Sequence, residues 1–200
     1  MLILGLDPGV ATTGYGLIHH HLDRDLKVHS YGWIETPKIM DQSNRLVSIE
    51  KQITDLICRE KPDVVSLEKL FFFANAKTAM MVSEAIGVIK LSIQKLNIPL
   101  FEYAPLRMKK IVTGNGRAKK PEVKEAVRQI LGTIAPSAKK TYFDDVADAL
   151  ALAICHSISI TNPEPLTRKP KKKGGERSWP TLKSVPLPIT LTKSKSPFLK

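Results

Sequence analysis

The order of short apolar runs and longer helical patterns most constrains how this chain can fold. Residues 2–7 form an apolar run that ends in the turn sequence Asp7-Pro8-Gly9. The same criteria predict strands at 2–7, 13–21, 26–35, 63–68 and 99–103, and helices at 43–60, 76–96, 106–112, 121–131 and 143–159. Three strands followed by alternating helices and strands are typical of an α/β protein. We therefore expect a mixed five-stranded sheet flanked by helices, with a hairpin loop at 22–25.

The last forty residues differ from the rest of the chain in charge and in proline content. The chain has 31 Lys and Arg against 19 Asp and Glu, and residues 161–200 hold ten of those basic residues but only two of the acidic ones. Seven of the 14 prolines also lie there. Such a segment cannot bury enough apolar surface to offset its ordering entropy. We predict a folded domain at 1–160 and a disordered basic tail at 161–200, which is either a solvated appendage or a non-specific phosphate-binding arm.

The composition excludes several classes of protein. No apolar run reaches the roughly 18 residues that a membrane span needs. The N-terminus reaches an acid and a Pro-Gly turn within nine residues, which is unlike a signal peptide. The two cysteines, Cys58 and Cys155, lie too far apart in sequence for a disulfide framework or a zinc cluster, and we expect both to be small buried hydrophobic side chains. This usage fits a reducing, cytoplasmic location.

Acidic residues stand where strands end and where the last helix begins. Asp7 ends the first predicted strand and Glu68 ends the fourth, while Asp145 and Asp148 are three residues apart on one face of the last helix. Asp144 lies four residues before Asp148 and could reach the same side. Each acid alone could be a turn, cap or helix-dipole residue. Together they would repel one another unless cations neutralise them, and oxygen ligands suit Mg²⁺ or Mn²⁺.

Four sequence blocks then resemble one family in order and in spacing. The blocks are ILGLDPGVATTGYG at 3–16, LEKLFF at 67–72, FEYAPLRMKKIVTGNGRAKK at 101–120 and DDVADALALAICH at 144–156. They are similar to the signature blocks of the RuvC family of bacterial Holliday-junction resolvases, which have a ribonuclease-H-like fold. The resemblance covers about residues 1–160 and leaves the tail outside it.

This resemblance implies a magnesium-dependent endonuclease that resolves Holliday junctions in recombination and DNA repair. Paired symmetric nicks in opposing strands would leave 5′-phosphate and 3′-hydroxyl ends. Asp7, Glu68, Asp145 and Asp148 match the family's catalytic acids and would bind two Mg²⁺ ions per site, with Mn²⁺ as an alternative metal. The register of the motif favours Asp145 over Asp144 as the metal ligand.

Basic and aromatic residues also match positions of the family. Lys109 and Lys120 match two lysines that act near the scissile phosphate, and Phe71 matches an aromatic residue that stacks on a base near the junction centre. The residues alone would indicate a solvated basic face for the two lysines and a core position for at least one of the three phenylalanines at 71–73.

The resemblance also implies partners, namely four-way junction DNA, a second copy of the chain and the RuvA–RuvB branch-migration complex. The wide apolar arc of the helix at 76–96, with the small residues Ala79, Ser83 and Gly87 at spacing four, is a candidate dimer interface. The alternative function is a non-cleaving protein that binds four-way junctions. An actin-like ATPase would need a second, duplicated domain, for which about 160 residues leave no room.

The histidines have ordinary structural explanations. His19, His20 and His21 are consecutive, and consecutive residues of a strand point to opposite faces, so we interpret them as a strand end rather than a metal site. His156 ends the last block on the helix at 143–159, where it could approach the acidic residues, but we expect it to pack against neighbouring secondary-structure elements.

Overall fold

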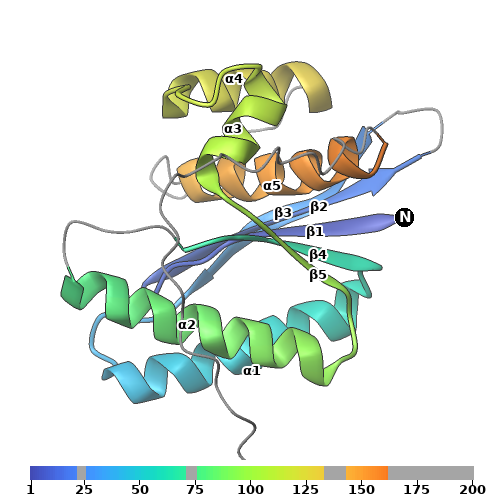
Figure 1. Ribbon diagram of the computed structural model, residues 1–200. Helices are drawn as coiled ribbons and strands as arrows, with labels where there is room; N and C mark the ends of the chain where they lie inside the picture. The colour runs from blue at the N-terminus through green and yellow to red at the C-terminus, as the bar shows by residue number, and fades with distance from the viewer. Residues whose placement is uncertain (22–25, 71–75, 133–142, 162–200) are drawn as a thin grey trace, which may run out of the picture. The chain divides into compact units, whose positions relative to one another are not determined.

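Five strands form one mixed sheet in the computed structural model, which describes residues 1–21, 26–70, 76–132 and 143–161 (Figure 1). The strands are β1 (Leu2–Asp7), β2 (Thr12–His20), β3 (Leu26–Glu35), β4 (Val64–Glu68) and β5 (Leu100–Tyr103). Their order in the sheet is β3-β2-β1-β4-β5. The β1–β2 and β2–β3 pairs are antiparallel, whereas β1–β4 and β4–β5 are parallel. The expected mixed five-stranded sheet is confirmed.

Five helices cover the two faces of this sheet in the part of the chain that is described. They are α1 (Gln42–Glu60), α2 (Ala76–Lys95), α3 (Pro105–Thr113), α4 (Lys120–Leu131) and α5 (Phe143–Thr161). Figure 1 shows α1 and α2 on one side of the sheet, α5 against the other side, and α3 and α4 beyond α5. The predicted elements are all present, and their ends differ from the prediction by at most two residues. The predicted loop at 22–25, Phe71 and the tail from 162 to 200 lie outside the described residues.

The alternation of side chains along the central strands determines what each face of the sheet carries. Leu4 and Leu6 of β1 belong to the hydrophobic core on the side of α1 and α2. Ile3 belongs to the second core, which includes buried residues of α3, α4 and α5. Because neighbouring residues of a strand point to opposite faces, Asp7 lies on the same face as Ile3, beneath α5.

Glycines in β1 and β2 allow the backbone of α5 to lie directly on the sheet. A Cβ atom at Gly5 would collide with the carbonyl oxygen of Ala149 and would lie 2.9 Å from the backbone nitrogen of Ala153. A Cβ atom at Gly14 would collide with the carbonyl oxygen of Asp145. Both neighbours are backbone atoms of α5 that no side-chain rotation can move. The absence of a side chain at these positions therefore sets how closely the helix and its acidic N-terminal turn approach β1.

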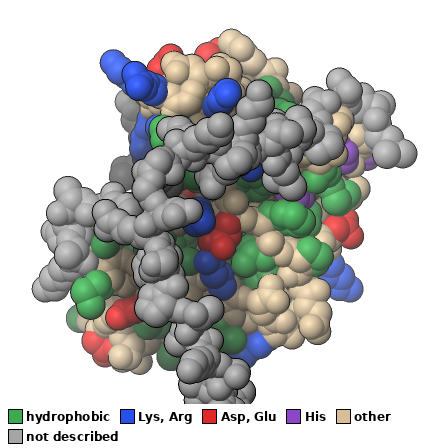
Figure 2. All heavy atoms as spheres, in the orientation of Figure 1, with side chains coloured by type: hydrophobic (Ala, Val, Ile, Leu, Met, Phe, Trp, Pro, Cys, Tyr) green, Lys and Arg blue, Asp and Glu red, His purple; other side chains and the backbone are tan. Residues whose placement is uncertain are grey.

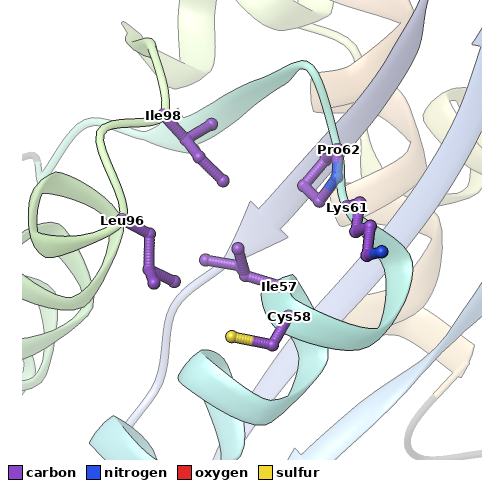
Figure 3. A pocket seen from close by; sticks show the side chains of 6 residues that line it. All are labelled: Ile57, Cys58, Lys61, Pro62, Leu96 and Ile98. Atoms are coloured by element: carbon purple, nitrogen blue, oxygen red, sulfur yellow. The ribbon is translucent and has the colours of Figure 1, made fainter.

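The expectation that Cys58 is buried is wrong. Cys58 is exposed, whereas Cys155 is fully buried as expected. The apolar stripe of α1 includes Ile53, Leu56 and Ile57, and Cys58 is the next residue around the helix, so its side chain leaves the core. Figure 3 shows this thiol in a surface hollow near the C-terminal ends of α1 and α2, lined by Ile57, Cys58, Lys61, Pro62, Leu96 and Ile98.

Two smaller expectations are also met. Strand β2 ends at His20, which agrees with the interpretation of the histidine tract as a strand end. Among the described residues, no helix combines the length and the hydropathy that a membrane crossing requires.

The close approach of α5 predicts that Gly5→Ala destabilises the protein by about 1–3 kcal/mol, because the new methyl group must displace a helix backbone. Urea unfolding followed by circular dichroism measures this change. Gly32→Ala is the matched control, since its Cβ would meet only the far end of the Tyr15 side chain. An equal cost at both glycines would contradict the role assigned to the backbone contact.

Candidate active site

Two carboxylates lie side by side at one end of the sheet because two neighbouring strands end there. Leu6 of β1 is in register with Leu67 of the parallel strand β4, so the next residues, Asp7 and Glu68, end these strands together. Glu68 lies two residues beyond Ser66, whose hydroxyl donates to the carbonyl oxygen of Leu152 in α5 over 2.8 Å. The period of two therefore places Glu68 on the α5 face, as it does Asp7.

The N-terminal turns of α5 bring two more carboxylates to the same place. Asp7 is in register with Gly14 of β2, and Gly14 is the residue against which the backbone of Asp145 packs. Asp148 follows one turn later and is only 20% exposed at its side chain. Figure 2 shows acidic side chains gathered beside Lys or Arg side chains near the middle of the visible face. The four acids predicted from sequence thus form one cluster.

The shifted pKa of Asp7 shows how strongly these acids interact. Burial raises its pKa well above the ordinary value, and the charges of Glu68, Asp148 and Asp145 raise it further. The side chains of Asp7 and Glu68 also share a hydrogen bond. This bond raises the pKa of Asp7 and partly offsets the rise in the pKa of Glu68. Burial and the neighbouring acids therefore favour the protonated form of Asp7 more than in an ordinary aspartate.

The pKa values of the other three carboxyl groups are also raised. Burial is the largest cause that raises the pKa of Glu68, Asp145 and Asp148. The negative charge of Asp148 adds to the rise at both Glu68 and Asp145. All four pKa values are thus raised, because the fold brings these carboxylates together where water solvates their charges poorly.

Two lysines offset part of this charge. The Nζ atom of Lys120, near the N-terminus of α4, lies 3.4 Å from Oδ2 of Asp148. Burial lowers the pKa of Lys120, but attraction by Asp148, Asp7 and Asp145 outweighs it and leaves the pKa raised. Lys109 of α3 is close enough that its charge lowers the pKa of Glu68 and Asp148. Both lysines predicted from sequence therefore lie beside the acid cluster.

The donor set fits hard divalent cations such as Mg²⁺. It consists of carboxylate oxygens alone, and their mutual repulsion is the interaction that a divalent cation would relieve. Among the described residues, no three His, Cys, Asp or Glu side chains already converge as metal ligands. The Asp7–Glu68 hydrogen bond and the Lys120–Asp148 ion pair are the contacts that metal binding would have to replace.

Asp144 has a different partner from its neighbours. Its Oδ1 atom is paired with Nζ of Lys124 on α4. Lys124 was not identified from the sequence, although its position four residues after Lys120 places it on the same side of α4. Asp144 is therefore paired with a lysine, whereas Asp145 lies among the partly buried carboxylates of the cluster.

His156 does not belong to the acid cluster. It is 2% exposed, its Nδ1 atom is 2.8 Å from the hydroxyl oxygen of Tyr103, and its ring lies 4.6 Å from that of Phe101. Burial, followed by the charge of His20, lowers its pKa. The expected role in packing between α5 and β5 is confirmed.

Comparison with known proteins gives the same assignment over most of the chain. The family model described as crossover junction endodeoxyribonuclease RuvC matches residues 3–156. A protein of that name from Caldicellulosiruptor saccharolyticus is 43% identical over 162 residues, which are 81% of this chain and 95% of that protein.

Solved structures extend the likeness to the fold. The RuvC structure from Thermus thermophilus is 26% identical, with a TM-score of 0.70 over 80% of this chain and 96% of that chain. The same protein in complex with a Holliday junction substrate is 25% identical, with a TM-score of 0.70 and the same coverage. The expected ribonuclease-H-like fold is thereby confirmed.

The raised pKa values predict how stability depends on pH when no metal is added. Above about pH 4, the folded protein binds more protons at these carboxyl groups than the unfolded chain does, so its stability falls as pH rises. Asp7→Asn removes one of the repelling charges. We expect this variant to be more stable than the wild-type protein near pH 7 in EDTA, and the gain to disappear below about pH 4.

Urea unfolding at a series of pH values measures this difference. Asp55→Asn, which removes an exposed carboxylate of α1, is the control and should change neither the stability nor its pH dependence. A gain for Asp7→Asn that persisted unchanged into acid would contradict the electrostatic origin of the effect.

Proposed function

The chain belongs to the RuvC family of crossover junction endodeoxyribonucleases, and on this premise we propose that it resolves Holliday junctions in DNA recombination and repair. It cuts two opposing strands of a four-way junction by symmetric nicks. In each nick, water adds to phosphorus and the bond to the 3′-oxygen breaks, which leaves a 5′-phosphate and a 3′-hydroxyl group.

The observation that carries this proposal is the cluster of four carboxylates at the ends of β1 and β4 and the start of α5, with two lysines beside it. All four acids and both lysines lie within the matched region, residues 3–156. A protein that only bound junctions would need the lysines but would have no use for four partly buried carboxylates whose charges repel one another.

Asp7, Glu68, Asp145 and Asp148 would hold the divalent cations, which we propose to be two Mg²⁺ ions with Mn²⁺ as an alternative. When bound, such ions activate water and stabilise the leaving oxygen of a phosphodiester. Metal binding requires the ionised form of Asp7, which burial and the neighbouring acids disfavour. The raised pKa values of the cluster therefore couple metal binding to proton release.

The two lysines receive the scissile phosphate. Lys120 is 61% exposed at its side chain, and its Nζ atom is held beside the cluster by Asp148. In the proposed reaction its side chain turns from Asp148 to a phosphate oxygen. Lys109 approaches from α3 and offsets the developing charge. As compact point charges, both suit a phosphate whose geometry changes during reaction. We also assign to Phe71 the stacking on a base near the junction centre, because its position in the sequence matches that aromatic of the family.

A second copy of the chain completes the enzyme, since a two-fold dimer places two sites on two symmetry-related strands. The surface of α2 supports this assignment. Met80 is 67% exposed and Leu91 55% exposed, and a Cβ atom at Gly87 would meet no atom within 4 Å. These three residues lie along one side of the helix, at spacings of seven and four, with the exposed Glu84 beside them, so a dimer contact here would bury the apolar surface of Met80 and Leu91.

The remaining assignments follow from the family. We propose that the protein acts in the cytoplasm beside the RuvA–RuvB branch-migration complex. We also retain the division into a nuclease domain at 1–160 and a basic tail at 161–200, because the family match ends at residue 156.

Cleavage of a labelled four-way junction tests the proposed function directly. We expect paired symmetric nicks in Mg²⁺, none in EDTA and none in a linear duplex of the same sequence. Asp7→Asn should lower the rate by roughly a thousandfold, since a bound metal supplies several kcal/mol of transition-state stabilisation. Asp55→Asn should cut at the wild-type rate, because Asp55 is an exposed residue of α1 away from the cluster.

Binding measured on the same DNA separates the two candidate functions. Tight junction binding without a nick in either Mg²⁺ or Mn²⁺ would overturn the nuclease and favour the non-cleaving binder. Equal cutting of junction and duplex would contradict selectivity for structure.

Sedimentation measures the proposed dimer. Leu91→Glu should weaken dimerisation roughly tenfold or more, because it would place a charge in an apolar contact. Ile130→Glu is the control, since Ile130 is an exposed apolar residue of α4, on the other side of the sheet from α2. A dimer that survives Leu91→Glu unchanged would exclude this face of α2 as the interface.

A further inference from the structure

One ion pair of the α4–α5 interface has no part in the function proposed above. Lys124 of α4 and Asp144 of α5 are bonded through Nζ and Oδ1. Their side chains are 31% and 39% exposed, so the pair is partly shielded from solvent but lies outside the buried core. Asp144 immediately precedes Asp145, and Lys124 follows Lys120 by one helical turn.

The pair forms the second rung of an ionic ladder between the two helices. Lys120 contacts Asp148 over 3.4 Å, and Lys124 contacts Asp144. The basic residues are four apart on α4, and the acidic residues are four apart on α5. The residue numbers rise in opposite directions along the two helices, since the earlier lysine pairs with the later acid. The rungs therefore fix the position of α4 along the length of α5.

Apolar contacts alone would not fix that position so well. Val123 and Val127 of α4 share the core on this side of the sheet with Val146 and Leu150 of α5. Burial of apolar surface is non-directional, so a small slide of one helix over the other changes it little. An ion pair joins two particular side chains, so the two rungs add specificity to the placement of α4 on α5.

Only one of the two rungs can persist during cleavage. In the proposed reaction Asp148 binds a metal and Lys120 turns to the scissile phosphate, so the contact between them is given up. Lys124 and Asp144 bind neither group, and their contact is unaffected. At that stage theirs is the one ionic contact between α4 and α5 among the described residues that still holds α4, and with it Lys120, in register.

We propose that Lys124 and Asp144 are positioning residues whose ion pair keeps α4 in register on α5 while Lys120 transfers from Asp148 to the scissile phosphate. This inference rests on the proposed nuclease function. It also assigns Asp144, which the sequence left as an alternative metal ligand, to a role outside the metal site. The pair acts through Lys120 and does not touch the reacting atoms.

Two other roles for these residues make different predictions. If Asp144 were a metal ligand, its removal would raise the Mg²⁺ concentration needed for cleavage. If Lys124 contacted DNA phosphate, its removal would weaken junction binding and lower the salt dependence of binding, while removal of the repelling Asp144 would strengthen binding. The positioning role predicts that removal of either residue has the same effect, on cleavage and not on binding.

A double-mutant cycle with Lys124→Met and Asp144→Asn tests the proposal on the full-length protein. We expect each single variant to lower the single-turnover cleavage rate at saturating protein roughly ten- to a hundredfold, since a small misplacement of a group at the phosphate has that effect. The double variant should be no slower than either single one, because both remove the same interaction. Lys124→Arg should restore most of the rate.

Binding and backbone measurements separate positioning from a general loss of structure. The junction affinity and the Mg²⁺ concentration at half-maximal rate should stay at the wild-type values in every variant. Amide hydrogen exchange of α4 should increase in both single variants, most in the presence of Mg²⁺, while exchange in α1 and α2 stays unchanged. Lys90→Met is the matched control, because Lys90 pairs with Glu102 over 2.7 Å at similar exposures of 36% and 32%.

Several results would contradict the positioning role of Lys124 and Asp144. Additive losses in the cycle, a shifted Mg²⁺ requirement or weaker junction binding would overturn the positioning role. Unchanged exchange in α4 would overturn it even if cleavage falls. If the wild-type protein does not cut junctions, the proposed function fails, while the exchange of α4 still decides whether the pair holds the helix.

Discussion

The mutual repulsion of four carboxylates at the ends of β1 and β4 and the start of α5 is the interaction on which the rest of this structure depends. Asp7 and Glu68 end adjacent strands on one face, and the start of α5 adds Asp145 and Asp148 above them. Burial raises the pKa of all four, so bringing them together lowers the stability of the fold. A site in which bare carboxylates are costly is one in which divalent cations bind favourably, and this connects the packing of α5 to the proposed chemistry.

The helices beyond α5 supply the compensating charge. Lys109 comes from α3 and Lys120 from α4, and both reach the acids over the N-terminal part of α5. In the proposed function these lysines serve two states of the protein. Without metal they offset the acids, and with metal and DNA bound they are free to contact phosphate. Because the same side chains must change partners, the helix that carries Lys120 needs a contact that does not change, and the pair of Lys124 with Asp144 provides one.

Several features could be predicted only incompletely from the sequence. Cys58 was expected in the core, but it lies one position beyond the buried stripe of α1, where 100° of rotation per residue separates inside from outside. The roles of Gly5 and Gly14 were not recognised, because a glycine in a strand has no pattern that names the backbone packed against it. Lys124 was likewise one lysine among many, since an ion pair between helices depends on their relative register.

The sequence by itself determined the element order, the acidic residues that end the strands, and the motifs that carry the family resemblance. Those are local properties, decided by side-chain periodicity and by which residues end each element. The tertiary structure decided which groups meet. The distance of α5 from the sheet, the raised pKa of Asp7 beside Glu68, and the ion pairs of Lys120 and Lys124 all arise from contacts between segments far apart in the chain. No local pattern encodes such contacts, because their energies depend on burial and on the relative position of packed elements.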